Sequence, residues 1–201
     1  VAQLLISTTS WVGLFKILAT FGSTALAGYT IAIRVVMFAL MPAWGLANAG
    51  ATLVGQNLGA DLPDRAEAAV KIATKFNIIF LGVVGAVFVA LGPAIVGLFT
   101  TDPAVFHFGH RALWIVSLAF PLYAAGMCLE SAFNGSGDTW TPTRLNFFCF
   151  WLVQVPLAWL LAHPLGCGPT GVFIAVPVSF SVLTAWSAIL FRRGTWKGHK
   201  V

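Results

Sequence analysis

Charged residues are scarce in this sequence. Only 8% of its 201 residues are Asp, Glu, Lys or Arg, whereas about a quarter of a soluble domain is usually charged. So few charges cannot cover a surface that faces water. Hydrophobic residues make up 59% of the chain, and its mean hydropathy is +0.90. The composition therefore excludes an ordinary soluble domain and indicates lipid as the surrounding solvent.

Several chemical signatures are absent as well. Cys128, Cys149 and Cys167 are too few for a disulfide framework and too far apart for a metal site, so we interpret Cys128 and Cys149 as small buried hydrophobic residues. His107 and His110 stand i, i+3 apart, but no carboxylate or cysteine accompanies them. The sequence has no Walker loop, no G-x-S-x-G and no H-E-x-x-H motif. We therefore expect neither an enzyme nor a bound metal or cofactor.

Long apolar runs fill the chain instead. A helix needs roughly 20 mostly apolar residues to cross a bilayer. The runs are continuous rather than alternating, which favours helices over a barrel. We predict spans at about 3–21, 25–57, 66–99, 105–133, 143–162 and 170–191. The predicted fold is therefore an all-α integral membrane domain of about six transmembrane helices, covering 1–201 as one unit.

Basic residues are distributed unevenly between the two sides of the predicted membrane. Eight lie on or near one side, namely Arg65, Lys71, Lys75, Arg144, Arg192, Arg193, Lys197 and Lys200. Only Lys16, Arg34 and Arg111 fall toward the other side. Because Lys and Arg accumulate in cytoplasmic loops, we predict a multi-pass protein of the inner (plasma) membrane with both ends of this segment cytoplasmic. The net charge of +5 thus indicates orientation in a membrane and not a nucleic-acid partner.

Prolines fall deep within several predicted spans. Pro42, Pro121 and Pro156 each remove a helical hydrogen bond, so we expect a kink at each. They are either the ordinary prolines of membrane helices or bends that frame a cavity. Asp102 and Thr141 each precede a proline and are predicted helix caps.

The second predicted span carries polar residues on one face, among them Arg34, Asn48 and Thr52. An arginine at the centre of a bilayer costs roughly 2.5–3.5 kcal/mol, so Arg34 should face protein or water. It is either a structural residue that bonds carbonyls or reaches the interface, or part of a substrate cavity or ion path. Thr9 lies in a polar cluster of the first span, which either lines a pore or hydrogen bonds its own backbone.

The fourth and fifth predicted spans carry the remaining candidates. Glu130 is the only acid well inside a span, and Tyr123 shares its helical face. Glu130 is either a protonatable coupling group or a partly hydrated acid near a helix end. Phe150 and Gln154 lie along one line of the fifth span. Such aromatic surface with few polar groups suits apolar or cationic organic ligands, but helix packing explains the same stripe.

Two stretches resemble a known family. The first, VGQNLGA at 54–60, ends a helix that contains Pro42 and Gly45 in mid-span. The second, NGSGDT at 134–139 followed by Pro142, matches the pattern G-x-G-D-T-x-x-P. Together, and in this order, they resemble the MATE (multidrug and toxic compound extrusion) family, and the resemblance extends over essentially the whole chain.

The resemblance implies one lobe of a twelve-helix transporter, whose two six-helix lobes are related by an axis along the membrane normal. The basic tail makes the chain similar to the C-terminal lobe, so the expected partner is an N-terminal lobe of the same chain, absent from this sequence. The implied activity is export of organic, often cationic, drugs or toxins by antiport with H+ or Na+. Some members carry acids where this sequence has Thr8, Thr9, Tyr123 and Ala124. If protonation couples transport, the acid is therefore either in the other lobe or Glu130, which is the local candidate.

Two other functions stay open. A related lipid-linked saccharide flippase would favour a cavity with more cationic side chains than Arg34 alone. A non-transporting membrane scaffold or partner subunit needs no cavity at all. The lipid bilayer is a partner in every case, whereas small organic substrates are partners of the exporter alone.

Overall fold

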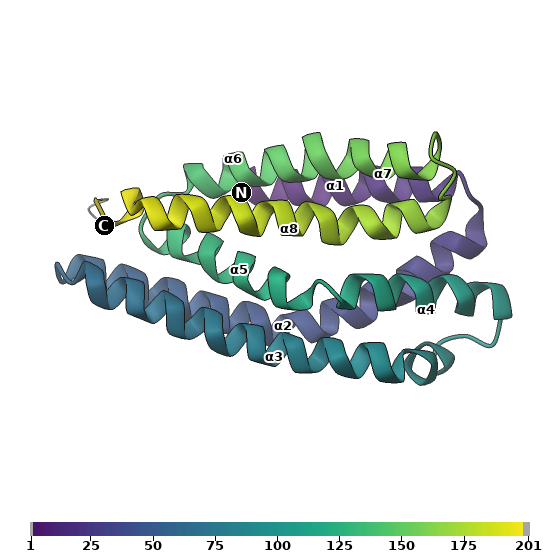
Figure 1. Cartoon of the computed structure of the whole chain (residues 1–201), viewed down its shortest axis with the longest axis horizontal. Helices are drawn as coiled ribbons and strands as arrows, with labels where there is room; N and C mark the ends of the chain where they lie inside the picture. The colour runs from purple at the N-terminus through teal and green to yellow at the C-terminus, as the bar shows by residue number, and fades with distance from the viewer. Residues whose placement is uncertain (1, 199–201) are drawn as a thin grey trace.

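Helices joined by short loops make up the computed structural model, which describes residues 2–198 (Figure 1). In chain order they are α1 (Ala2–Ala19), α2 (Ser23–Gly59), α3 (Pro63–Gly97), α4 (Pro103–Ser117), α5 (Phe120–Gly135), α6 (Trp140–Asn146), the π-helical segment η1 (Phe147–Gln154), α7 (Val155–Ala162), α8 (Pro169–Arg193) and the 3₁₀ segment η2 (Thr195–Gly198). Residues 2–198 contain no strand. The predicted all-α fold is confirmed.

Most of the helices have the length and composition of membrane spans. Within residues 2–198, five helices qualify when α6, η1 and α7 are taken as one, and the bent pair of α4 and α5 makes a sixth if it counts as one span. Helices α2 and α3, with 37 and 35 residues, exceed the roughly 20 residues that a bilayer needs. Large apolar side chains face outward, such as Phe38 with 79% of its surface exposed. This surface suits lipid or a second protein body, and not water.

The helices form two groups. Helices α1, α6, α7 and α8 lie together, and α2 to α5 pack on their other side (Figure 1). The α2–α3 loop, the α5–α6 loop and η2 lie at one end of the bundle, which we call the basic end because Arg65, Arg144 and Lys197 belong to it. The opposite end, with the loops after α1, α3 and α7, is called the far end. Lys200, which was predicted on the basic side, lies outside the described residues.

The fourth span is bent where Pro121 follows α4. Helices α4 and α5 meet at 56°. Because Pro121 has no N–H to donate to the Ser117 carbonyl, the chain tightens there, and the Ala119 N–H donates to the Val116 carbonyl at 3.2 Å. Helix α3 makes room for the freed carbonyl, since a Cβ on Gly85 would stand only 2.9 Å from the Ser117 oxygen.

The other two predicted kink positions differ from this break. Before Pro156 the chain widens into the π-helical segment η1, where the Val155 N–H donates to the carbonyl of Phe150, five residues back. Pro156 removes one donor from the next turn, and η1 absorbs the change of register without ending the span. Pro42 lies inside α2, which continues as one helix to Gly59.

The two predicted caps have different outcomes. Asp102 caps α4 as predicted, because its Oδ1 accepts hydrogen bonds from the N–H groups of Ala104 at 2.8 Å and Val105 at 3.2 Å. The prediction for Thr141 was wrong, because α6 already begins at Trp140. Asp138 takes that role instead, accepting from the Thr141 N–H at 3.0 Å and from its hydroxyl at 2.6 Å. The aspartate is preferred because its two oxygens reach both donors.

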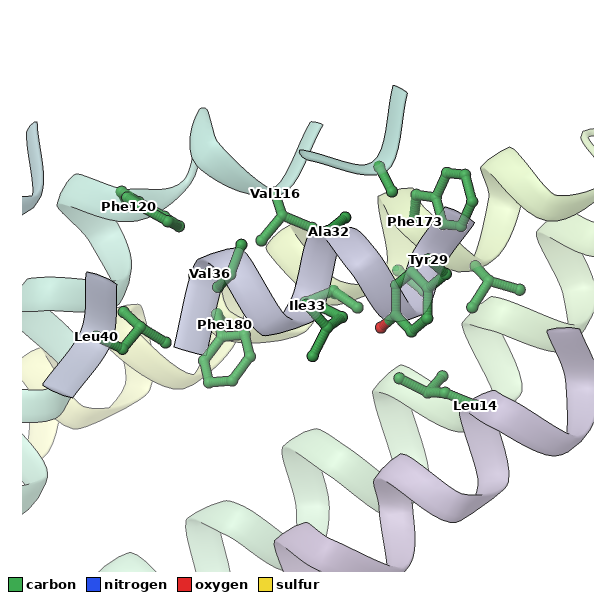
Figure 2. Packing of buried hydrophobic residues seen from close by; sticks show 14 of the residues in the cluster. Leu14, Tyr29, Ala32, Ile33, Val36, Leu40, Val116, Phe120, Phe173 and Phe180 are labelled. Carbon is green, nitrogen blue, oxygen red and sulfur yellow. The ribbon is translucent and has the colours of Figure 1, made fainter. Parts of the chain in front are cut away.

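The main core runs through the middle of the bundle toward the far end (Figure 2). Tyr29 of α2 is fully buried and stacks on Phe173 of α8, with ring centroids 5.4 Å apart. Phe15 of α1 meets the same tyrosine edge-on at 5.6 Å. Helices α2 and α4 approach closely beside them, since a Cβ on Gly28 would stand 2.7 Å from the Gly109 nitrogen.

A smaller core holds the basic end together. Its centre is Trp196, which is fully buried although it lies beyond α8. Gly194, at φ 71°, ends α8 in the left-handed region and turns the chain back so that Trp196 stacks on Phe191 at 4.9 Å. The next residue, Lys197, contacts the carboxylates of Glu67 at 2.5 Å and Asp64 at 3.6 Å on α3. Cys128 and Cys149 are buried free thiols, as predicted.

Candidate functional site

A cavity of about 660 Å³ opens in the half of the bundle nearer the basic end. Residues of α1, α2, α5, α6, η1 and α8 line it, from Gln3 and Asn134 at the basic end to Phe15 and Ile33 further in. Its polar lining consists of Gln3, Ser7, Thr8, Asn48, Glu130, Ser131, Asn134 and Asn146. Its aromatic lining consists of Trp11, Phe15, Trp44, Tyr123, Phe150 and Phe180. A cavity of this size and composition suits a small organic ligand.

Glu130 on α5 is the only acid in this lining. Its Oε1 is buried and has no hydrogen-bond partner. The side chain of Asn146, from α6, interacts with the carboxyl group, and the Oδ1 of Asn146 is also buried without a donor. One buried acceptor oxygen on each of these two side chains is therefore without a donor. An arrangement of this kind is costly unless a proton, a cation or water completes it.

Three rings from three helices form one wall of the cavity. Phe180 of α8 contacts Tyr123 of α5 at a centroid distance of 4.1 Å and Phe150 of η1 at 5.2 Å. Aromatic faces attract organic cations through their quadrupoles and also provide apolar contact area. The wall therefore offers contacts to flat or cationic organic molecules, and Glu130 lies in the same lining.

The π-helical segment positions Phe150 in this wall. The wider turn rotates the residues of η1 relative to those of an α-helix, and π-bulges are frequent at functional sites. Segment η1 is also tied to α1, because the Trp151 indole N–H donates to the Ile6 carbonyl at 3.2 Å. The sequence predicted a kink at Pro156, but it gave no indication of a π-helix before it.

A pair of amides lies at the mouth of the cavity. The Gln3 Nε2 donates to the Asn134 Oδ1 at 3.0 Å and to the Thr139 carbonyl at 3.1 Å, and the Asn134 Nδ2 donates back at 3.4 Å. These bonds join the first turn of α1 to the last turn of α5 and to the α5–α6 loop. From the sequence, Asn134 belongs to the NGSGDT motif and lies one turn beyond Glu130, whereas Gln3 was not predicted as a site residue. A lone glutamine near the start of an apolar run was the available signal.

Four of the predicted site residues come together in this cavity, namely Asn48, Tyr123, Phe150 and Glu130. The others lie outside its lining. On α1, Thr8 lines the cavity, whereas Thr9 is exposed and its hydroxyl donates to the Leu5 carbonyl at 2.5 Å. A change of one residue turns a helix by about 100°, which carries Thr9 past the edge of the face on which Ser7 and Thr8 line the cavity.

Three further candidates also lie outside the lining. Thr52 is exposed one turn beyond Asn48, to whose carbonyl its hydroxyl donates at 3.1 Å. Arg34 is exposed on α2 and makes no ion pair within residues 2–198. Gln154 is 1% exposed, and neither of its amide atoms has a partner. A role for these residues in a substrate path stays a prediction.

Comparison with known proteins gives a consistent result. The sequence model of the MatE family matches residues 1–160. The "Probable multidrug resistance protein NorM" of Caulobacter vibrioides is 30% identical over 196 residues, which cover 96% of this chain and 41% of that protein. The "Probable multidrug resistance protein YoeA" of Bacillus subtilis is 26% identical over 180 residues, covering 90% of this chain and 39% of that protein.

Solved structures show the same fold. "MATE transporter ClbM in complex with Rb+" superposes with a TM-score of 0.91 at 25% identity and covers 99% of this chain and 47% of its own. An inward-facing "multidrug resistance MATE family transporter" superposes with a TM-score of 0.89 at 22% identity, covering 100% and 47%. The chain thus spans less than half the length of these relatives.

Proposed function

The chain belongs to the MatE family, and from that premise we propose that it forms one lobe of an exporter of organic, often cationic, compounds that is driven by antiport of H+ or Na+. Members of this family are transporters and not enzymes, and the chain is accordingly part of a multi-pass membrane protein. A second lobe of the same protein would supply the other wall of the substrate path. This partner is consistent with the share of the relatives' length that the chain covers.

The observation that carries the proposal is the 660 Å³ cavity with its aromatic wall and its single acid. Six aromatic residues offer adaptable contacts to flat organic molecules, and neutral amides and hydroxyls add hydrogen bonds without fixing one ligand shape. One carboxylate favours a cation over an anion. This combination suits broad recognition of organic cations, as the relatives named for multidrug resistance would require.

Glu130 is the proposed coupling residue. A proton bound to its carboxyl group would supply the donor that the Asn146 Oδ1 lacks, and a bound Na+ would instead take ligands from the same two oxygens. Either ion removes the net charge of the carboxylate and with it the attraction for a cationic substrate. Ion and substrate would therefore occupy the site alternately, which is the requirement for antiport.

We propose that the protein lies in the inner (plasma) membrane and that its basic end faces the cytoplasm. The basic residues predicted on that side support this, in line with the positive-inside rule. Because the cavity lining reaches Gln3 and Asn134 at the same end, substrate would enter from the cytoplasm or the inner leaflet. Export then requires that the two lobes close this end and open the other.

Transport by the full-length native protein tests the proposal. The protein would be reconstituted in liposomes, and ethidium movement would be followed under a pH gradient, a Na+ gradient or neither. We expect one gradient to drive exchange and Glu130→Gln to slow it at least tenfold, which corresponds to about 1.4 kcal/mol in the barrier. Asp61→Asn is the matched control, since it also removes one carboxylate but lies in the exposed α2–α3 loop at φ 57°, a conformation that asparagine tolerates.

The outcomes separate the parts of the proposal. A wild-type rate in Glu130→Gln would remove this residue from the mechanism and leave the exporter intact. Failure of both gradients to move any of several organic cations, with a correctly folded protein, would contradict the exporter function itself. The gradient that drives exchange identifies the coupling ion.

A further inference from the structure

A second, shallower cavity lies on the outside of the bundle. It has a volume of about 530 Å³ and shares no lining residue with the cavity around Glu130. One face of α1 forms one side, and α7 with the residue that follows it forms the other. We call it the α1–α7 groove, and its lining consists of Gly13, Lys16, Ile17, Thr20, Val155, Pro156, Trp159 and His163.

Apolar residues line most of the groove. The two helices approach closely at Gly13, where a Cβ would stand 3.4 Å from the Val155 Cγ2. Toward the far end, Ile17 and Pro156 line the sides, and Trp159 is 52% exposed. Tryptophan in such a position is typical of the membrane interface. The apolar part of the groove is therefore open to lipid chains.

Its polar residues gather near the far end of the bundle. Lys16 lies in the last turn of α1 and is exposed. The Thr20 Oγ1 lies 3.4 Å from the His163 Nε2, and the His163 ring stacks on Trp159 at 5.8 Å. An ammonium group, a hydroxyl and an imidazole thus line one groove. The Lys16 ammonium is able to donate hydrogen bonds to an anion, whereas the Thr20 hydroxyl donates its one hydrogen to the Ile17 carbonyl at 2.7 Å.

Within the described part of the chain, no acidic side chain forms an ion pair with Lys16. Of the six acidic residues, Asp61, Asp64, Glu67 and Asp138 belong to the basic end, and Glu130 lines the inner cavity. The sixth, Asp102, caps α4 through its own side chain. Within residues 2–198 Lys16 makes no ion pair. The charge at the end of the groove is therefore complementary to an anion from outside this lobe.

We propose that the α1–α7 groove binds a phospholipid with an anionic headgroup. Its phosphate accepts hydrogen bonds from Lys16 and lies beside Thr20 and His163, and an acyl chain lies along Ile17, Val155 and Pro156. The combination of a cation and an exposed tryptophan at the polar end with an apolar slot beneath them matches both parts of such a lipid. On the orientation proposed above, the lipid belongs to the outer leaflet. The inference does not depend on which compound the protein exports.

Lipid retention by the purified full-length protein tests this site. The protein would be extracted from membranes that contain phosphatidylglycerol and phosphatidylcholine with identical chains, and the bound lipid would be counted by native mass spectrometry. We expect retention of phosphatidylglycerol, and a loss of at least threefold in Lys16→Gln. Arg111→Gln is the matched control, because Arg111 is an exposed cation on α4 outside the groove, and it should retain lipid like the wild type. Equal losses in both variants, or no retention, would overturn the proposal.

A photo-reactive benzoylphenylalanine at position 159 identifies what occupies the groove. Cross-links to phosphatidylglycerol support the proposal. Cross-links to a peptide of the same protein would overturn it, because a second lobe would then cover the groove. Displacement of the retained lipid by millimolar inorganic phosphate would also overturn it, since the groove would then be a site for free phosphate.

Discussion

The two halves of this lobe are built from the same helices but packed in opposite ways. In the half toward the far end, Tyr29, Phe173 and Phe15 stack on one another, and the close approach at Gly28 brings α2 against α4. In the half toward the basic end, helices α1, α2, α5 and α8 surround a cavity of about 660 Å³. Contacts at its mouth and around Trp196 join the helices there, and α5 approaches α8 closely where the Thr184 hydroxyl donates to the Leu122 carbonyl at 2.8 Å.

The border between the halves coincides with the two interruptions of the helices. Pro121 lies two residues before Tyr123, and the π-helical segment contains Phe150, so both interruptions adjoin the wall that Phe180 completes. Redirecting α5 and η1 at this level changes a solid bundle into a hollow one. We propose that the far half is the rigid support and that the basic half, which contains the cavity, binds substrate.

The largest effect should follow from a substitution in the smaller core around Trp196, at the basic end. Trp196→Ala deletes a fully buried indole ring and leaves a cavity among Phe191 and its neighbours, which typically costs about 3–5 kcal/mol. We expect a clear fall in Tm, measured in detergent by loss of the monodisperse peak on size exclusion. Trp140→Ala, at an exposed tryptophan of the same end, is the control. Equal Tm values for the two variants would show that the smaller core does not hold the basic half together.

The far half should respond to added volume. Gly28→Leu places a side chain against the Gly109 backbone, and overpacking of this kind costs typically about 1–3 kcal/mol. Gly45→Ala on the same helix has no atom within 4 Å of the new Cβ and should melt like the wild type. If Gly28→Leu keeps the wild-type Tm, the far half is not the rigid support that the comparison requires.

A smaller effect is expected at the mouth of the cavity. Gln3→Ala removes the amide pair with Asn134 and the bond to the Thr139 carbonyl, and the exposed position limits the cost to about 1 kcal/mol. The variant should therefore fold normally but take up ethidium faster from the basic end, because the mouth is less restrained. A lowered Tm with unchanged uptake would mean that the pair is only structural.

The smallest effect concerns the ion pair between Lys197 and Glu67, next to the smaller core. The carboxylate of Glu67 raises the pKa of Lys197. The ion pair therefore stabilises the folded state fully at pH values below the ordinary lysine pKa of about 10.4. This stabilisation is lost as the pH rises through the raised pKa of Lys197. The pair is partly exposed, which limits its contribution to about 1 kcal/mol or less. Lys197→Met should lower the Tm slightly at pH 8 and by less above pH 11. A constant difference across this range would exclude the charge as its cause.

Some of this architecture follows from the sequence because it depends on local chemistry. The apolar runs predict the helices, Pro121 marks the sharp bend, and Asp102 before a proline predicts its cap. The same reasoning gave a wrong cap at Thr141, because Asp138, three residues earlier, offers two acceptor oxygens. A capping pattern therefore predicts where a helix begins more reliably than it predicts which side chain caps the helix.

The features that the sequence did not predict depend on contacts between distant segments. Gln3 meets Asn134, and Trp196 returns to the core after Gly194 reverses the chain. Helical phase sets a further limit, since Thr8 rather than Thr9 lines the cavity. The π-helical turn around Phe150 shifts that phase, and no residue pattern in the sequence specified it.

The central claim is that the hollow half near Glu130 is where substrate binds, and chemical protection tests it most directly. In the full-length protein with Cys167→Ser, which removes the exposed thiol, single cysteines would be placed by Asn48→Cys in the cavity lining and by Thr52→Cys one turn away outside it. The rate of maleimide labelling would be measured with and without ethidium. We predict that ethidium slows the labelling of the cysteine at position 48 severalfold and leaves the labelling rate at position 52 unchanged. Equal rates with and without ethidium at position 48, in a protein that transports ethidium, would contradict it.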